Sequence, residues 1–447
     1  MFDDNFLLWR LSGNMLRVLI NAYACSPDMG SEPGMAWNWC VHLAKHCELH
    51  IITEGEFCER IEAVVPTLPQ GKNMHFYYNP IGGDNVERCE KIRRMCWNQG
   101  DWRFYKYYRD WQWKTYLMAK EICSKEKIDI LHQLNMIGFR EPGYLWKLSK
   151  ESGIKFVWGP VGGIKLFPMK YVVGGGLRMR LFMAIKNALN ILQLRYHPRV
   201  SQALRQASCV ISSIPDSCDA LKRYKNIKSL IIPETGCFTD NDDMEVKRNF
   251  FSEYLDILWV GKFDFRKRLD IALGAIAGCG NPNIRLAVYG TGNELQVETM
   301  KRLSDNLGIS GRVQWMGNKS NDVTQKAMRT THLLLFTSVS EDTSTVVMEA
   351  ISNRLPVLCF DTCGMGYVIN DMVGKRVTLS NPEKSVEDFA RIINHLYDNR
   401  SVLEEMSENC SIRRVELSWE NKALAVLDIY KEVLGRGELP ACGMSEK

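Results

Sequence analysis

The sequence predicts an α/β protein built from two doubly wound, Rossmann-like domains. Short apolar runs alternate with helical patterns along almost the whole chain, which is typical of parallel strands joined by crossover helices. Two such series are separated by the polar stretch 238–250. The chain has 447 residues, too many for one ordinary hydrophobic core, so two domains are expected.

The strands follow from buried apolar runs that are too short for helices. In the first series they are expected at 16–22, 48–53, 74–79, 128–134, 155–160, 208–213 and 228–236, with a helix over 34–46. In the second series they are expected at 256–262, 284–290, 313–317, 332–336 and 356–360. The amphipathic stretch 418–434 predicts a last helix that packs back on the first domain.

These elements give a domain plan. We expect an N-terminal extension over 1–14, a Rossmann-like first domain over 15–240, a Rossmann-like second domain over 241–417, and a C-terminal helix and tail over 418–447. Two facing domains of this kind would form a cleft lined by strand ends, a common place for ligands.

Composition excludes several classes of protein. Hydrophobic content is 45% and charged content 24%, both ordinary for a soluble globular protein. The 15 cysteines are odd in number and scattered, which favours reduced thiols in a cytoplasm over a disulfide framework. No stretch reaches the ~20 apolar residues of a membrane span, and the first 14 residues do not resemble a signal peptide.

Charge and aromatic residues are unevenly distributed. Residues 153–215 contain no Asp or Glu but nine Lys and Arg, and 97–116 interleaves Trp, Tyr and Phe with cations. These segments favour contact with an anionic membrane surface or a lipid-linked anion. A sugar platform or an ordinary core helix also fits 97–116, whereas nucleic acid is not favoured because no known reading motif accompanies the cations.

Two glutamates stand where a buried strand gives way to a helix. Glu341 follows the strand 332–336, and Glu349 lies on the helix that Thr343 or Ser344 would cap. The free amides of a helix start suit phosphate, and carboxylates accept hydrogen bonds from hydroxyl groups. The pattern fits a nucleotide sugar, and the alternative is two solvated glutamates on a surface helix.

A basic loop follows the first strand of the second domain. Lys262 and Lys267 could hold a diphosphate and stabilise the charge that develops when it leaves, in place of a divalent metal. A solvated loop is the alternative. The loop 27–39 contains Gly30 and Gly34, either of which would let backbone approach a phosphate, although a plain turn fits equally well.

Histidines and acidic residues give weaker signals. His132 closes a first-domain strand and would face the cleft, although a lone histidine is more often structural. His42 and His46 have a zinc-like spacing without a nearby third ligand, so no metal site is expected. The acidic stretch 240–243 imitates a metal-binding motif but lies in the polar linker, where we expect it to be solvated.

Taken together, these motifs resemble the retaining glycosyltransferases of family 4, also called group 1, which have the GT-B fold. "SEDTSTVVMEAISNRLPVLCF" is similar to the family's E-x7-E element and "VGKFDFRKRLD" to its basic phosphate loop. "AVYGTGNE" and "VQWMGNKSNDV" match the next two strand–loop elements. "YACSPDMGSEPGMAWNW" and "FVWGPVGG" resemble first-domain loops of polysaccharide-building members. The resemblance extends from about Met15 to Leu434, and the order of the motifs is specific for the family.

The resemblance implies that the first domain binds the acceptor and the second domain the nucleotide sugar, and it implies a role for each matching residue. Glu341 would bind hydroxyls of the donor sugar, Glu349 the ribose, and Lys262 and Lys267 the diphosphate, while His132 would lie near the reacting centre. The catalytic residues are therefore expected to be His132, Lys262, Lys267 and Glu341. The donor-binding residues are expected to be Gly34, Gly290, Met316, Gly317, Asn318, Glu341, Thr343, Ser344, Thr345 and Glu349, with the backbone of 316–318 at the nucleobase.

The sequence departs from the family pattern at three places. Ser344 stands where the family has a glycine beside the sugar phosphate, which puts the identity of the donor in doubt. Arg268 replaces the glycine after the basic loop, and Arg354 replaces a helix-ending glycine, so local backbone geometry is in question there.

We expect a cytoplasmic, metal-independent enzyme without a cofactor, peripheral on the inner face of the cell membrane, that acts in surface polysaccharide biosynthesis. It would move a hexose, with retention, from a UDP- or GDP-sugar to a glycan or lipid-linked glycan. A nucleotide-sugar epimerase on the same fold and a catalytically silent binding module are the alternatives, and an NAD-dependent oxidoreductase is more distant. Front-face attack is the expected mechanism, with a covalent glycosyl-enzyme as its competitor.

Overall fold

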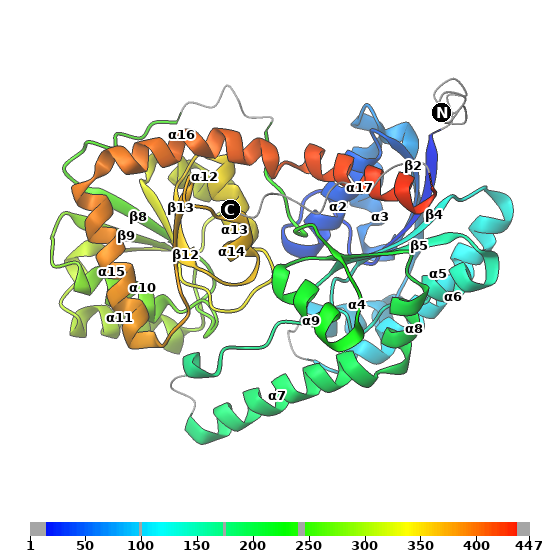
Figure 1. Ribbon diagram of the computed structural model, residues 1–447, viewed down its shortest axis with the longest axis horizontal. Helices are drawn as coiled ribbons and strands as arrows, with labels where there is room; N and C mark the ends of the chain where they lie inside the picture. Colours follow the sequence, from blue (N-terminus) through cyan, green and yellow to red (C-terminus); the bar gives the residue numbers. More distant parts are fainter. Residues whose placement is uncertain (1–14, 98–100, 173–175, 240–245, 436–447) are drawn as a thin grey trace. The chain divides into compact units, whose positions relative to one another are not determined.

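The chain forms two compact units, each built on one parallel β-sheet (Figure 1). The structure is a computed structural model, and it describes residues 15–97, 101–172, 176–239 and 246–435. Unit 1 contains the chain up to 164, 190–234 and the chain from 419, and unit 2 contains 165–189 and 235–418. Helices pack on both faces of each sheet, which confirms the predicted fold class.

Unit 1 has a seven-stranded sheet in the order β3-β2-β1-β4-β5-β6-β7. Its strands are β1 (Leu16–Ala22), β2 (Cys47–Glu54), β3 (Met74–Asn79), β4 (Ile130–Asn135), β5 (Lys155–Val161), β6 (Cys209–Ser212) and β7 (Leu230–Ile231). Its helices are α2 (Ser31–Leu43), α3 (Cys58–Val64), α4 (Val86–Trp97), α5 (Phe104–Lys125), α6 (Leu145–Ser152), α8 (Pro198–Gln206), α9 (Pro215–Lys225) and α17 (Trp419–Val433). Short 3₁₀ turns cover Gly55–Phe57, Val65–Thr67 and Gly71–Asn73.

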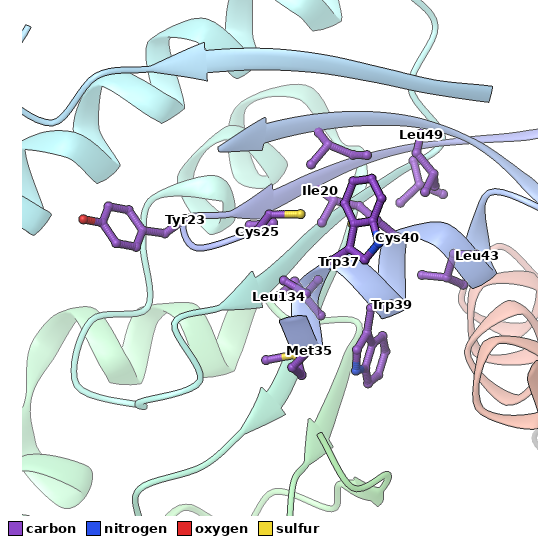
Figure 2. Packing of buried hydrophobic residues seen from close by; sticks show 14 of the residues in the cluster. Ile20, Tyr23, Cys25, Met35, Trp37, Trp39, Cys40, Leu43, Leu49 and Leu134 are labelled. Atoms are coloured by element: carbon purple, nitrogen blue, oxygen red, sulfur yellow. The ribbon is translucent and has the colours of Figure 1, made fainter. Parts of the chain in front are cut away.

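Alternating side chains of β1 build the two hydrophobic cores of unit 1. Val18 and Ile20 pack in the cluster that contains α2 and α17, and Leu19 packs in the cluster that contains α5, α6 and α8. This alternation is the two-residue period of a strand that is buried on both faces. Figure 2 shows Trp37 of α2 beside Ile20 and Leu49, so a large aromatic side chain fills the space between helix and sheet.

The last helix of the described chain, α17, is tied to unit 1 by polar as well as apolar contacts. Tyr430 Oη lies 2.6 Å from His132 Nδ1, and His132 Nε2 lies 2.7 Å from the carbonyl oxygen of Gly159. Because a carbonyl only accepts hydrogen bonds, Nε2 carries the proton and Nδ1 accepts from the tyrosine. Lys422 Nζ also donates to the carbonyl oxygen of Pro233 at 2.5 Å.

His42 of α2 and His46 in the turn after α2 serve the same contact. His46 Nε2 lies 2.9 Å from Glu420 Oε1 of α17, and His42 Nδ1 lies 3.5 Å from Glu420 Oε2, beside the ion pair of Lys45 with this carboxylate. Although burial alone would raise it, hydrogen bonds from Lys45 and His46 lower the pKa of Glu420 to about 2. In the described part of the chain no group of His, Cys, Asp and Glu side chains has the arrangement of a metal site.

Unit 2 has a six-stranded sheet in the order β10-β9-β8-β11-β12-β13. Its strands are β8 (Leu255–Val260), β9 (Ile284–Tyr289), β10 (Val313–Gly317), β11 (Leu333–Phe336), β12 (Val357–Phe360) and β13 (Gly374–Val377). Its helices are α10 (Leu269–Gly278), α11 (Glu294–Asn306), α12 (Asn321–Thr330), α13 (Thr345–Ser352), α14 (Cys363–Val368), α15 (Pro382–Asp398) and α16 (Arg400–Glu416), and a 3₁₀ turn covers Ser310–Arg312.

The central strand of unit 2, β8, also contributes side chains to two hydrophobic cores. Ile257 and Trp259 of β8 pack with α10 and α15, and Leu258 packs in the cluster that contains α13. The sequence analysis did not predict the edge strand β13. Its four residues include Lys375 and Arg376, so it lacks the apolar run that marks the other strands, and it pairs with β12 from Val357 to Phe360.

Residues 165–189 group with unit 2, whereas the sequence analysis counted them with the first domain. The reason is Tyr171, which belongs to the 3₁₀ turn Met169–Tyr171 and is buried in the core of unit 2. Its ring packs edge-on against Phe360 at 5.6 Å, and its hydroxyl lies 2.7 Å from Ser385 Oγ. The helix that follows, α7 (Gly176–Tyr196), continues into residues that group with unit 1.

None of the helices in the described part of the chain combines the length and the hydropathy that a bilayer-spanning segment needs. The cysteines of the described residues are free thiols.

Buried His132 predicts that acid weakens the fold. Burial lowers the pKa of His132 to about 4, against an unfolded value near 6.5. The unfolded chain therefore binds more protons between these values, so stability falls as the pH drops through this window. By this linkage, equilibrium urea unfolding should show a loss of about 2 kcal/mol from this group between pH 7 and pH 5.

The control for this measurement is His132→Gln, which does not titrate in this window. It should lose less stability than the wild type over the same pH range, since the other histidines are unchanged. Equal losses in the two proteins would show that His132 does not stay neutral in the fold.

Candidate functional site

The candidate site lies where the strand order of unit 2 reverses direction. From β8 the chain builds β9 and β10 on one side, and it then returns to place β11 on the other side of β8. In open parallel sheets, ligands bind beyond the carboxyl ends of the strands at such a switch point. The loops after β8 and β11 carry Lys267 and Glu341, so the topology brings these predicted residues together.

Hydrogen bonds fasten the basic loop after β8 to the loop after β11. Thr337 Oγ1 donates to the carbonyl oxygen of Lys267 at 2.7 Å, and the Val339 amide donates to that of Arg266 at 2.9 Å. Trp259 Nε1 donates in turn to Thr337 Oγ1 at 3.1 Å. The position of Lys267 is therefore set by backbone contacts on a rigid sheet edge rather than by a free loop.

Lys267 and Glu341 form an ion pair at this edge. The ammonium group contacts Glu341 Oε1 and lies 5.0 Å from the centre of the Phe336 ring. Ser338 Oγ donates to the same carboxylate oxygen at 2.9 Å. Both side chains are mostly buried, with 18% of Lys267 and 16% of Glu341 exposed, so the pair is less screened than a surface pair.

Lys262 differs from Lys267 in its surroundings. It follows β8 directly and its side chain is exposed to solvent. Between the two lysines, Asp264 accepts hydrogen bonds from the Arg266 amide at 2.8 Å and from its guanidinium group at 2.9 Å. Of the two predicted cations, Lys267 is the one that the fold holds against Glu341.

The helix α13 starts beside this pair. Its N-cap is Ser344, one of the two predicted caps, in an extended conformation without a side-chain capping bond. Thr343 and Ser344 are buried, and Thr345 opens the first turn, in which the Val347 amide donates to the carbonyl oxygen of Ser344 at 3.1 Å and the two preceding amides have no acceptor within the helix. An oxyanion at this helix start would meet free N–H groups and the positive end of the helix dipole.

Glu349 lies on α13 and faces α12 rather than Lys267. Asn321 Nδ2 at the start of α12 donates to Glu349 Oε1 at 3.0 Å. Burial raises the pKa of Glu349, and the bond from Asn321 partly opposes this shift. A cavity of about 520 Å³ opens beside this pair, with Lys326, Arg329 and Asn353 in its lining.

The predicted nucleobase contacts, Met316 to Asn318, follow the end of β10. Met316 and Gly317 are half-buried and Asn318 is exposed, and the carbonyl oxygen of Gly317 accepts a hydrogen bond from the Gly290 amide at 2.8 Å. Gly290 has φ +140°, and a Cβ there would stand 1.8 Å from the carbonyl oxygen of Gly261. Only glycine fits this position, so Gly290 brings the loops after β8, β9 and β10 together.

The predicted first-domain residues are placed within unit 1. His132 has no exposed surface and both ring nitrogens are used in the core, so in this structure it cannot reach a substrate as we expected from the sequence. Gly34 lies in α2, where a Cβ would stand 2.1 Å from the carbonyl oxygen of Met29. Gly34 therefore lets the helix pack against its own preceding loop, and its contact with donor stays a prediction. The acidic stretch 240–243 lies outside the described residues.

The aromatic segment 97–116 is largely a core element within its described part. Phe104, Tyr108 and Trp111 of α5 are buried, and Trp102 and Trp113 are exposed. Thus the ordinary packing role accounts for part of this segment, and two indole rings remain available at its surface.

Both arginines that replace family glycines adopt a left-handed backbone. Arg268 has φ +51° and Arg354 has φ +55°, in the region that favours glycine. The Arg268 guanidinium pairs with Asp270 at 2.7 and 2.8 Å and also bonds the carbonyl oxygen of Tyr171. At Arg354 the backbone carbonyl accepts from Arg248 and Ser407. The family geometry therefore persists at both positions despite the different residues.

Comparison with known proteins agrees with this geometry. Residues 240–412 match the family model described as "Glycosyl transferases group 1". This part of the chain is therefore similar to group 1 glycosyltransferases. The switch-point loops, the ion pair and the start of α13 all lie within it.

Relatives of known description match part of the chain. The D-inositol 3-phosphate glycosyltransferase of Mycolicibacterium smegmatis is 26% identical over 181 residues, 40% of this chain and 40% of the relative. Its counterpart in Mycobacterium tuberculosis (strain F11) is 30% identical over 186 residues, 40% of this chain and 37% of the relative. This chain therefore spans about two fifths of the length of these relatives.

Solved structures extend the likeness to the whole fold. Sucrose-phosphate synthase from Thermosynechococcus elongatus has a TM-score of 0.63 at 16% identity, over 94% of this chain and 99% of that one. HepE of Anabaena in complex with UDP has a TM-score of 0.59 at 14% identity, over 94% and 100% of the two chains. At these identities the likeness concerns the fold, which is the GT-B fold of glycosyltransferases.

Sequence analysis missed the residues that hold the site in place. Ser338 and Asn321 each bond one of the two glutamates, and Thr337 fixes the backbone of Lys267. Ser338 could have been found from its place three residues before Glu341 at a strand end. Asn321 had no such signal, because its contact with Glu349 joins elements 28 positions apart.

The two left-handed arginines should respond in opposite ways to replacement by glycine. Arg354→Gly relieves a strained conformation without losing a side-chain partner among the described residues, and it should stabilise the protein by up to about 1 kcal/mol. Arg268→Gly also relieves strain but removes the Asp270 pair and the Tyr171 contact, and it should destabilise by about 1–2 kcal/mol. Urea or thermal unfolding of the two variants checks the signs. A loss of stability in Arg354→Gly would contradict the conformational explanation.

Proposed function

We propose that the protein is a retaining glycosyltransferase that moves a hexose from a UDP- or GDP-sugar to a glycan acceptor. The observation that carries the proposal is the Lys267–Glu341 pair at the carboxyl ends of β8 and β11, inside a group 1 glycosyltransferase domain. The family match supports a transferase, and HepE, a protein of the same fold, has been solved with UDP and with UDP-glucose.

In this proposal Lys267 stabilises the leaving group. When the bond between the sugar and the diphosphate breaks, negative charge grows on the departing phosphate oxygen. A fixed cation about 4 Å away contributes roughly 4 kcal/mol at an effective dielectric near 20, before desolvation. Because the charge is larger in the transition state than in the ground state, the lysine accelerates the step rather than only binding the donor. The exposed Lys262 adds a second cation at the entrance of this site.

Glu341 would bind hydroxyl groups of the donor sugar. When the donor binds, its diphosphate would replace the Glu341 carboxylate as the partner of Lys267. The hydrogen bond from Ser338 would then keep the Glu341 carboxylate oriented while it accepts hydrogen bonds from the sugar. The ion pair thus holds both side chains in their working positions before the donor arrives, which lowers the reorganisation needed on binding.

The rest of the donor would extend along the strand ends. The first turn of α13, with Thr343, Ser344 and Thr345, would receive a phosphate. Glu349, oriented by Asn321, would bind the ribose hydroxyls beside the 520 Å³ cavity, and the backbone of 316–318 would meet the nucleobase. This arrangement uses the donor-binding residues that the sequence suggested.

The transfer itself needs no covalent intermediate. The bond between the anomeric carbon and the phosphate oxygen breaks, and its electron pair leaves with the nucleoside diphosphate. The acceptor hydroxyl oxygen attacks the same face, so the configuration is retained, and its proton passes to the departing phosphate oxygen. No protein base is required, which agrees with the burial of His132.

We assign the acceptor to unit 1. A cavity of about 520 Å³ beyond the end of β3 is lined by Arg88, Arg109 and Lys114 together with Trp113 and Tyr144. Cations and aromatic faces suit a sugar that carries phosphate or carboxylate groups. We therefore propose an anionic, lipid-linked glycan as acceptor, and a cytoplasmic protein peripheral on the inner face of the cell membrane.

Removing either member of the pair should impair transfer. Lys267→Ala and Glu341→Ala should each lower the transfer rate by ~10²–10³-fold, the scale of one preorganised electrostatic contact. Screening UDP-, GDP- and ADP-sugars by thermal shift identifies the donor for this assay. Lys301→Ala, an exposed lysine on α11, is the matched control and should keep the wild-type rate.

Three outcomes would contradict the proposal. Wild-type-like rates in both site variants would remove the assigned roles. A donor that changes its sugar without any acceptor would identify an epimerase. The absence of UDP and GDP binding by calorimetry would favour a silent binding module.

The reaction should not depend on a divalent metal. Because Lys267 and Lys262 would supply the positive charge at the diphosphate, transfer should continue at an unchanged rate in EDTA. Loss of activity in chelator, restored by magnesium or manganese, would show that a metal ion neutralises the diphosphate instead.

A further inference from the structure

The helix α7 exposes a continuous apolar stripe. Leu177, Leu181, Ile185, Leu189 and Leu192 follow one another at intervals of three or four residues, so they share one face of the helix. Leu177 is 82% exposed and Leu181 59%, and the other three are about half exposed. Phe182 and Tyr196 are also exposed, at the margin of this face. The stripe covers most of a helix of 21 residues, which is about 30 Å long.

The opposite face of α7 already makes the contacts that hold the helix. Met183 is buried in the core that contains Tyr171, and Asn187 bonds both the amide and the carbonyl oxygen of Phe167 at 2.9 Å. Further along, Asn190 bonds the carbonyl oxygen of Ile164 at 3.0 Å, and Leu194 is buried in a core of unit 1. The inward face is complete, so the exposed stripe is not needed to fix α7 in the fold.

The charged residues of α7 are all positive: Arg178, Arg180, Lys186 and Arg195. Arg178, Arg180 and Arg195 are exposed, and none makes an ion pair with another described residue. The helix lies within the segment 153–215, which contains no Asp or Glu. An apolar helix face flanked by cations and free of acidic residues is the pattern of helices that lie in an anionic lipid interface.

We propose that α7 is a membrane-docking helix whose stripe inserts into a bilayer surface that carries anionic headgroups. The apolar side chains would enter the boundary between headgroups and acyl chains, and the arginines would contact lipid phosphates. A second copy of this chain is the competing occupant. Pairing two such faces would bring two sets of unpaired arginines together without an acidic partner, which opposes self-association. This docking goes beyond the donor chemistry of unit 2 and is tested separately from it.

Vesicle sedimentation of the full chain tests the stripe. The wild type should sediment with vesicles containing phosphatidylglycerol and much less with pure phosphatidylcholine. The combined variant Leu181→Ser, Ile185→Ser and Leu189→Ser should bind the anionic vesicles at least roughly tenfold more weakly, since apolar burial drives insertion. A control removes three exposed apolar side chains outside α7, and it should bind like the wild type: Leu295→Ser, Met372→Ser and Ile412→Ser.

A second variant tests the cations. Arg178→Gln should weaken binding to the anionic vesicles roughly fivefold, the effect of one basic residue at such a surface. Binding by the wild type should also fall as salt is raised. Circular dichroism and UDP binding should be unchanged in all variants, which separates the loss of docking from the loss of fold and from the donor site.

Three results would overturn the proposal. The first is a wild-type protein that does not sediment with phosphatidylglycerol vesicles. The second is a stripe variant that binds these vesicles as tightly as the wild type does. The third is a concentration-dependent dimer in analytical ultracentrifugation that the stripe variant abolishes, because a second copy would then be the occupant. Intact UDP binding in any of these cases would leave the proposed transfer reaction standing, whereas the first result would also remove the proposed membrane location.

Discussion

The attachment of the loop after β8 to the loop after β11 is the constraint on which the site depends. Thr337 and Val339 bond the backbone carbonyls of Lys267 and Arg266, and this register places a cation and a carboxylate at the one sheet edge where the strand order reverses. Backbone hydrogen bonds between neighbouring strand ends cannot shift without disturbing the sheet. The positions of Lys267 and Glu341 therefore depend on the topology of the sheet as well as on the side chains.

The two glutamates of one short segment are held in different environments. Glu341 has a cation and a hydroxyl group beside it, whereas Glu349 has one amide and a desolvated position that favours its protonated form. In the proposed function Glu341 would bind hydroxyl groups of the sugar, and Glu349 would bind the ribose at a smaller electrostatic cost to the nearby phosphates, because burial favours its neutral form. The two glutamates are eight positions apart because Glu341 lies in the loop after β11 and Glu349 in the second turn of α13.

Sequence reasoning succeeded where a local pattern carries the information. Buried apolar runs located twelve of the strands, and the sequence also located the strand–helix junction at Ser344, the N-cap of α13. It failed where position depends on distant partners. β13 has no apolar run, Tyr171 joins unit 2 through Phe360 and Ser385, and His132 is buried because Tyr430, 298 positions away, covers it. Arg268 and Arg354 show the converse, since the backbone kept a glycine-like conformation that the residue type did not indicate.

The path of the chain has a consequence for biosynthesis. Unit 1 is assembled from three separate stretches, and its final helix α17 comes from the end of the described chain. While the ribosome is still making unit 2, the surface around Trp39 and His132 therefore lacks its cover. That surface of the first sheet therefore stays exposed until Trp419–Val433 has been synthesised. Residues 235–418 are contiguous in the chain, so their hydrophobic core can form earlier. A chain truncated before α17 would thus have an incomplete hydrophobic core in unit 1 and a folded unit 2.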